Sequence, residues 1–219
     1  MSVLVFYIVS SIAFLCAIVI HEVAHAWTAD RLGDPTARLK GRITLNPLAH
    51  MDLYGTVLVP FFLILVRSPL IFGWAKPVIY DSYNLQNPKR DSAIIAFSGA
   101  AANFILSVIL AIIFRVVILF PLLSQTILVS FLFETIRINL ILGLFNLIPI
   151  HPLDGGKVFI GFLPKDQAQE ADIFLRRYGM LILFLLIFPI WSGVSPVSVI
   201  LWPVIKFILN ILIPANLPV

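Results

Sequence analysis

The sequence has very little charge. Only 12% of its 219 residues are Asp, Glu, Lys or Arg, whereas 60% are hydrophobic, and the mean hydropathy is +1.04. A water-soluble domain of this length could not bury that much apolar surface. The scarcity of charge therefore excludes a soluble globular protein and predicts an integral membrane protein.

Cysteine and long polar stretches are scarce as well. Cys16 is the one cysteine, so the chain cannot form an internal disulfide. No polar stretch is long enough to form a second folded module, and the sequence has no internal repeat or low-complexity tract. We therefore expect residues 1–219 to form a single membrane domain.

The charges that are present are distributed unevenly. The net charge is +4, but the basic residues fall in a few short loops and not in one patch, which argues against nucleic-acid binding. The turns near residues 120–126 and 191–197 contain no Lys or Arg. Because cytoplasmic loops are enriched in these residues, a multi-pass protein with its N-terminus outside is predicted. The basic loop residues are Arg31, Arg38, Lys40, Arg42, Lys76, Lys89, Arg90, Lys157, Lys165, Arg176 and Arg177.

A metal-binding pattern follows the first hydrophobic run. Residues 3–20 are apolar without interruption and lead directly into the sequence HEVAH at 21–25. On a helix, this spacing places His21 and His25 one turn apart on one face as a pair of zinc ligands, with Glu22 beside them as a candidate general base. No basic residue precedes the run, so we expect a retained transmembrane helix and no signal peptide.

The rest of the chain predicts an all-α polytopic membrane protein with about five transmembrane helices. Two of them follow the first helix in the middle of the chain, and two more lie near the C-terminus. The expected helices cover about residues 3–29, 91–120, 124–148, 172–190 and 197–212.

Residues 33–80 differ from the helical segments. Glycines and prolines punctuate this region, and weakly alternating sequences at 38–45 and 74–80 predict short membrane-associated β-strands. The apolar segment 56–72 has basic residues on both flanks. A re-entrant segment keeps both flanks in the cytoplasm, whereas a single crossing would not.

A third metal ligand is predicted near the end of the helix at 124–148. A catalytic zinc site needs three protein ligands and one open position. Counting crossings from an outside N-terminus, this helix end lies at the same depth as His21. The following sequence, NLIPIHPLDGG at 146–156, breaks the helix with prolines and carries Asp154. A carboxylate at this depth needs a partner, and a metal held with His21 and His25 would supply one.

Taken together, HEVAH, the sequence GAAAN at 99–103 and NLIPIHPLDGG resemble the site-2 proteases, intramembrane zinc metalloproteases of peptidase family M50. The resemblance covers roughly residues 5–190 and implies a core of three helices, at about 3–29, 91–120 and 124–148. Through the sequences at 41–55 and 73–78 it is similar to the minimal bacterial subgroup, which lacks a PDZ or CBS domain.

The resemblance implies a function and a set of site residues. The function is regulated intramembrane proteolysis, in which peptide bonds within or next to transmembrane segments of protein substrates are cut, here in a bacterial inner membrane with the active site near the cytoplasmic side. One Zn²⁺ per chain would be bound by His21, His25 and Asp154. Glu22 would be the general base, and Asn146 would lie near the scissile carbonyl.

Substrate contacts are predicted from the strand-like sequences. A transmembrane substrate hides its amides in its own helix, so it must unwind before cleavage. An exposed strand edge at 38–46 or 76–80 could hold it in an extended form by β-augmentation. The predicted substrate contacts are Ile43, Thr44, Val78 and Asn103, although Asn103 could instead pack between helices and form an interhelical hydrogen bond.

Three other functions compete with this interpretation. A zinc membrane protease of another family, acting on membrane-anchored tails, would ordinarily use a Glu as its third ligand. A metal transporter would need ionisable groups leading to both membrane faces. A catalytically inactive binding protein would have no need of Glu22. The oligomeric state is left open.

Three further polar residues have two interpretations each. His50 and Asp52 could form a second metal site or gate, or a hydrogen-bonded turn. His151 could act directly in catalysis, or it could stabilise the loop that carries Asp154.

Overall fold

The computed structural model describes residues 3–65, 73–124, 126–189 and 193–213. Every regular element within these ranges is helical. In chain order they are α1 (Val3–Arg31), α2 (Thr36–Leu39), η1 (Pro47–Ala49), η2 (Leu53–Leu58), α3 (Val59–Leu65), η3 (Ser82–Asn84), α4 (Pro88–Val117), α5 (Pro121–Ser124), α6 (Ile127–Asn146), α7 (Asp154–Phe162), α8 (Lys165–Ile187) and α9 (Pro196–Leu212).

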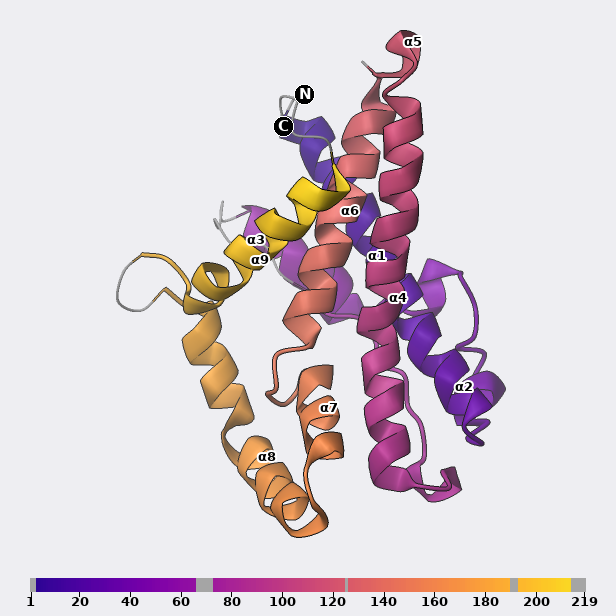
Figure 1. The fold of residues 1–219 in the computed structure, drawn as a ribbon, viewed down its shortest axis with the longest axis vertical. Helices are drawn as coiled ribbons and strands as arrows, with labels where there is room; N and C mark the ends of the chain where they lie inside the picture. The colour runs from indigo at the N-terminus through magenta and orange to yellow at the C-terminus, as the bar shows by residue number, and fades with distance from the viewer. Residues whose placement is uncertain (1–2, 66–72, 125, 190–192, 214–219) are drawn as a thin grey trace.

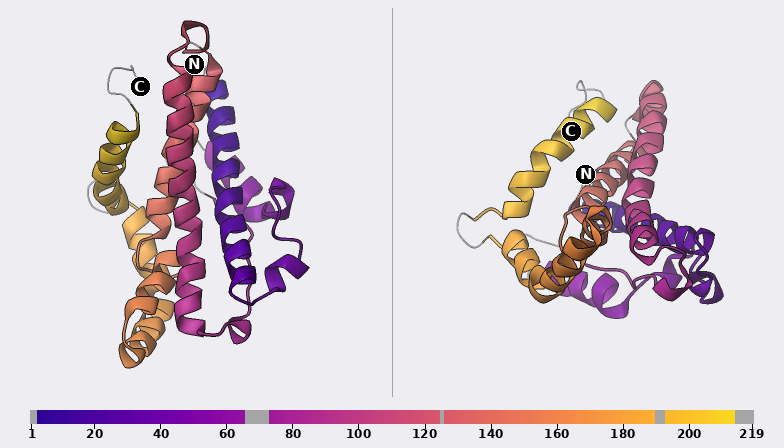
Figure 2. Two further views of the ribbon diagram at one scale, coloured as in Figure 1. Left: turned by 45° about the vertical axis from the view of Figure 1, so that its right-hand side comes forward. Right: turned by 60° about the horizontal axis from the view of Figure 1, so that its bottom comes forward.

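Three long apolar helices form the centre of the molecule. In the described residues, α1, α4 and α6 are the helices long and apolar enough to cross a membrane. They lie side by side, with α7 beside the lower half of α4 and the α8–α9 pair on one flank (Figures 1 and 2). This arrangement agrees with the predicted all-α membrane protein.

The expectation of about five transmembrane helices is wrong for the described part of the chain. α8 begins earlier than predicted, at Lys165, and its first half is rich in charged residues. α9 has 17 residues and contains Pro203. At 1.5 Å per residue it is about 26 Å long, which is short for the apolar core of a bilayer.

The predicted β-strands are also wrong. Part of 38–45 belongs to α2, and the chain then turns at Gly41, whose φ of +65° favours glycine. Residues 74–80 are extended but pair with no strand within the described residues. Their backbone groups bond instead to isolated partners, which are the Gly55 and His50 carbonyls and a side chain of α1.

The two ends of the apolar segment that follows residue 52 lie next to each other. Asp52 caps η2, and η2 continues into α3. In η2 the Val59 amide donates to the Tyr54 carbonyl, five residues earlier. The next residue, Pro60, has no N–H to donate to the Gly55 carbonyl in the same way. The Gly55 carbonyl instead accepts from the Trp74 amide at 3.1 Å. The Trp74 ring covers Gly55 and leaves no room for a Cβ there. This closed excursion agrees with a re-entrant segment, of which residues 66–72 lie outside the described part.

Buried polar contacts join the membrane helices. Glu134 of α6 accepts from Arg137 at 2.5 and 2.8 Å and from Ser10 of α1 at 2.8 Å. In an exposed contact near the C-terminal end of α4, Arg115 donates to the last carbonyls of α9. Such pairing is expected where bilayer lipid offers no hydrogen-bonding partner.

Candidate metal centre

α1 brings the two histidines of the HEVAH sequence together. They lie one helical turn apart and face α4, with only 5% of His21 and 7% of His25 exposed. Their ring centroids are 4.5 Å apart, with the rings nearly perpendicular. This geometry follows from the four-residue spacing of the two histidines along the helix.

Asp154 enters the same site from α7. α6 ends at Asn146, and a turn leads to Asp154 as the first residue of α7. A Cβ at Gly155 would lie 2.3 Å from the Ile148 carbonyl oxygen, so the glycine allows the start of α7 to pack against the preceding turn. Asp154 Oδ2 lies 3.0 Å from Nε2 of His21 and 3.0 Å from Nε2 of His25.

The hydrogen bonds of the two rings fix which nitrogen faces Asp154. His21 Nδ1 lies 2.7 Å from Asn103 Oδ1, and His25 Nδ1 lies 2.6 Å from the Ile95 carbonyl oxygen. A carbonyl oxygen can only accept, so in the neutral rings each Nδ1 carries the proton and each Nε2 presents a lone pair. Two nitrogen lone pairs and a carboxylate oxygen thus converge on one point.

This set of three acceptors fits a metal ion. The three ligand atoms lie within 4.8 Å of one another. Atoms bound at about 2.0–2.2 Å to a tetrahedral zinc ion stand roughly 3.3–3.6 Å apart, slightly farther than the 3.0 Å between each histidine nitrogen and the Asp154 oxygen. Without a cation, three converging acceptors would repel each other, whereas two His nitrogens and a carboxylate oxygen are ligands that zinc prefers.

Gly99 provides the space for the imidazoles. A Cβ at this position of α4 would lie 2.5–2.6 Å from ring atoms of both His21 and His25. The α4 backbone therefore forms a wall against which the two rings rest. The absence of a side chain at Gly99 thus lets α4 approach both candidate ligands.

Glu22 lies beside the cluster with its side chain half-buried. Its Oε2 accepts a hydrogen bond of 3.0 Å from the backbone amide of Val78. The extended segment 74–80 therefore runs along the face of α1 that carries the candidate base. On the same segment, the ammonium group of Lys157 from α7 lies over the Tyr80 ring, 4.9 Å from the ring centroid.

The other predicted site residues have different positions. Asn146 is the last residue of α6, and its side chain donates to the Leu142 carbonyl of its own helix. Asn103, predicted as a substrate contact, is fully buried and bonds instead to His21 of α1 and Asn139 of α6. Ile43 and Thr44 lie in a bend, so neither presents a strand edge.

The structure assigns His50, Asp52 and His151 to local contacts. His50 Nε2 donates to the Thr44 carbonyl, and Asp52 accepts from two amides at the start of η2. His151 Nε2 lies 3.2 Å from Asp172 of α8. Burial raises the pKa of the Asp172 carboxyl, but bonds from Arg176 and His151 outweigh this, and the pKa falls below its usual value. These contacts favour the hydrogen-bonded turn and the loop-stabilising role.

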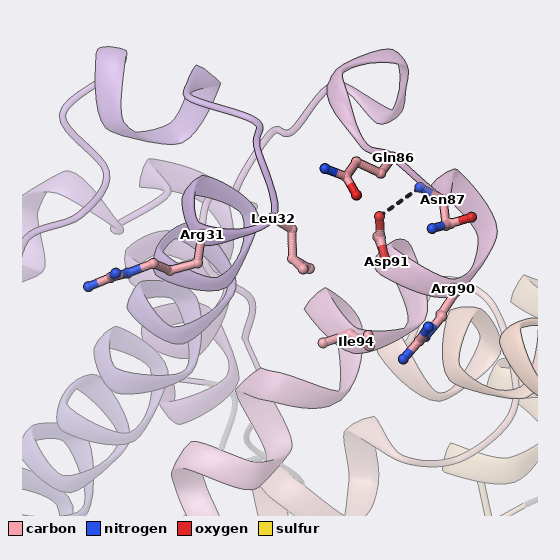
Figure 3. Close-up of a pocket in the computed structure, with 7 residues that line it drawn as sticks. All are labelled: Arg31, Leu32, Gln86, Asn87, Arg90, Asp91 and Ile94. Atoms are coloured by element: carbon pink, nitrogen blue, oxygen red, sulfur yellow. Dashed lines mark hydrogen bonds between the residues drawn. The ribbon is translucent and has the colours of Figure 1, made fainter.

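A separate cavity of about 290 Å³ lies between the end of α1 and the start of α4. Figure 3 shows its lining, in which Asp91 accepts from the Asn87 amide at 2.8 Å. Arg31 directs its guanidinium over the Trp27 ring, 5.1 Å from its centroid. The cavity contains none of the three metal-binding candidates.

Comparison with known proteins gives consistent matches. The chain matches the model of peptidase family M50 over residues 9–127 and 121–186. It is 33% identical over 206 residues, 89% of this chain and 84% of the relative, to "Putative zinc metalloprotease YwhC" of Bacillus subtilis (strain 168). It is 30% identical over 97 residues, 44% of this chain and 36% of the relative, to "Putative zinc metalloprotease Rip2" of Mycolicibacterium smegmatis (strain ATCC 700084 / mc(2)155). No solved structure gives a significant match.

Proposed function

The chain belongs to peptidase family M50 as a membrane-embedded zinc metalloprotease, and we propose that it hydrolyses peptide bonds within or next to transmembrane segments of protein substrates. The observation that carries this proposal is that Asp154 of α7 lies against His21 and His25 of the apolar helix α1. His21 follows Val3 by 18 residues, about 27 Å along α1. A scissile bond must therefore reach the inner part of the membrane.

Glu22 is the proposed general base. A zinc ion held by His21, His25 and Asp154 would supply Lewis-acid chemistry that makes a water at the site far more acidic than bulk water. The Glu22 carboxylate would accept the proton from this water and later deliver it to the leaving amine. Because the Val78 amide binds Oε2, the carboxylate is held in place, and Oε1 is the oxygen proposed to take the proton.

Asn146 is proposed to stabilise the negative charge that develops on the scissile carbonyl oxygen. Its side-chain amide now donates to the Leu142 carbonyl at 3.1 Å, within α6. Rotation of this side chain would release the amide N–H for substrate. Asn146 therefore changes partners between the resting and substrate-bound states in this proposal.

Substrate is proposed to run along the extended segment 74–80. The amides of Trp74, Lys76 and Val78 bond towards the protein. In an extended chain, alternate residues point to opposite sides, so the amides of Ala75 and Ile79 face away from these partners. This outer side could bond an unwound substrate, although Pro77 interrupts it. Ile43, Thr44 and Val78 would contribute only side-chain contacts.

The function is tested with the purified protein in lipid vesicles that also contain a single-span substrate. We expect wild-type protein to cut this substrate, and Glu22→Gln to lose cleavage while it keeps its zinc. Adding a Gly-Pro pair to a poorly cut substrate, near the depth of His21, should increase cleavage because the helix unwinds more easily. Cleavage confined to soluble loops would contradict the intramembrane proposal.

A further inference from the structure

Asn139 of α6 is fully buried and belongs to no predicted site. Its side-chain oxygen lies 2.7 Å from the side-chain nitrogen of Asn103, and Asn103 Oδ1 lies 2.7 Å from His21 Nδ1. We infer that Asn139, acting through Asn103, is a positioning residue for the zinc ligand His21, a role that rests on the proposed metal centre.

Backbone carbonyls fix the direction of every hydrogen bond in this chain of contacts. Asn139 donates through Nδ2 to the Thr135 carbonyl at 2.8 Å, so its Oδ1 must face Asn103. Asn103 donates through Nδ2 to the Ala17 carbonyl at 3.0 Å and to Asn139 Oδ1. Both Nδ2 hydrogens of Asn103 are then used, and Oδ1 is left to accept from His21. The two amides thus hold the proton of His21 on Nδ1.

Burial makes these hydrogen bonds strong constraints. Asn103, Asn139 and Ala17 are all 0% exposed, and Thr135 is 3% exposed. In such apolar surroundings an unpaired amide is costly, so neither Asn can turn over without losing partners. Metal-bound histidines depend on partners of this kind to fix the ring tautomer and orientation.

The two histidines are supported in different ways. His25 Nδ1 bonds to the backbone carbonyl of Ile95, which no substitution removes. His21 depends on the side chain of Asn103 and, beyond it, on Asn139 of a third helix. The position of His21 is therefore sensitive to side-chain changes on both α4 and α6.

Asn139 could also serve only to pack α6 against α4, as buried Asn residues do in membrane helices. Ser107 offers a matched control for this alternative. It is fully buried at the same interface, and its hydroxyl donates to the Asn103 carbonyl at 2.9 Å without any contact to His21. Ser107→Ala removes an α4 polar contact but leaves the amide chain intact.

The experiment measures zinc affinity by competition with a chromophoric chelator, on wild-type protein and on Asn103→Ala, Asn139→Leu and Ser107→Ala. Thermal unfolding of the metal-free forms reports the fold separately. We expect about a 10–100-fold loss of affinity for Asn103→Ala and at least about a threefold loss for Asn139→Leu. Ser107→Ala should bind zinc as wild type does. If Asn139→Leu shows no unfolding transition, Asn139→Ala replaces it.

The His21→Ala background separates positioning from packing. There, Asn139→Leu should cause no further loss of zinc affinity, because the chain of contacts ends at His21. A loss of the same size in both backgrounds would overturn the inference, as would wild-type affinity in Asn103→Ala and in Asn139→Leu. Wild-type affinity in His21→Ala itself would overturn the metal centre as well.

Discussion

Gly99 shows how closely α4 is fitted to the two proposed zinc ligands, His21 and His25. Gly99→Ala would place a Cβ about 2.5 Å from His25 and 2.6 Å from His21, closer than side-chain carbons approach other atoms. One or both rings must then move from the metal. We expect zinc affinity to fall about 10–100-fold, as measured by chelator competition.

Gly143→Ala is the control for that change. Its Cβ would lie 3.1 Å from the Phe104 ring, at the α4–α6 interface away from the histidines. Phe104 can move slightly, so zinc affinity should stay within about threefold of wild type. An equal loss in both variants would mean that α4 packing in general, and not contact with the ligands, controls metal binding.

Glu22 allows the base to be tested separately from the metal. Gln has the size of Glu and can still accept from the Val78 amide through its carbonyl oxygen, but it cannot accept a proton at neutral pH. Glu22→Gln should keep one zinc per chain and lose about 10²–10⁴-fold in cleavage rate. Metal analysis and cleavage of a vesicle-embedded substrate measure the two properties. Cleavage at the wild-type rate would remove Glu22 from the mechanism.

Local spacing in the sequence was enough to predict that His21 and His25 share a helix face. Asp154 could be placed with them because crossing counts put it at the same depth. The contact between Asn139 and Asn103 could not be predicted, because it depends on the rotation of α6 about its axis. That rotation is set by packing over the whole helix. The signal available in the sequence was an Asn within an otherwise apolar helix.

At the level of elements, α7 and the 74–80 segment show where sequence patterns failed. Three glycines, at 155, 156 and 161, lower the helix propensity of α7, but each permits a close contact, such as that of Gly161 with Ala93 of α4. Tertiary packing thus outweighed propensity. Residues 74–80 have strand-like sequence and are extended, but a strand also needs a partner, which sequence alternation cannot reveal.

Asp34, which lies just after α1, binds the residues that follow the 74–80 segment. Its buried carboxylate accepts from Thr36, from the Asp81 amide and from the Asn84 side chain. Burial raises the pKa of Asp34, but these hydrogen bonds outweigh it, and the pKa lies below the ordinary 3.8. Asp34→Ala leaves several donors unpaired and should destabilise this region by about 1–3 kcal/mol at neutral pH.

The pH dependence of that effect has a definite sign. Because the folded pKa is lowered, the carboxylate contributes fully above pH 3.8, and the contribution is lost as the pH falls through the folded value. Proteolysis of residues 73–87 in detergent should therefore be faster for Asp34→Ala than for wild type at neutral pH. Asp30→Ala, which removes only a partly exposed pair with Arg38, is the control. Equal protection in both variants would show that Asp34 does not hold the segment.

At the level of the whole molecule, the path of the chain through the membrane decides which face the active site serves. With the N-terminus outside, as the basic loops predict, three crossings would put α2, η3 and the end of α7 in the cytoplasm and α5 outside. In Figure 1, α5 lies at one end of the bundle, and α2 and α7 lie towards the other.

This topology predicts the labelling of single cysteines placed at exposed positions in a Cys16→Ala background. An impermeant maleimide should label Leu122→Cys in spheroplasts, and Leu39→Cys, Tyr83→Cys and Phe162→Cys only in inverted vesicles. These four residues are 79–95% exposed.

Tyr83 is the decisive position because it follows the apolar segment 56–72. A helix of 18 residues would separate Gly55 from Trp74 by about 27 Å, whereas their backbones are hydrogen-bonded at 3.1 Å. External labelling at Tyr83 with internal labelling at Leu39 would mean that the segment crosses the membrane and that this contact does not exist there.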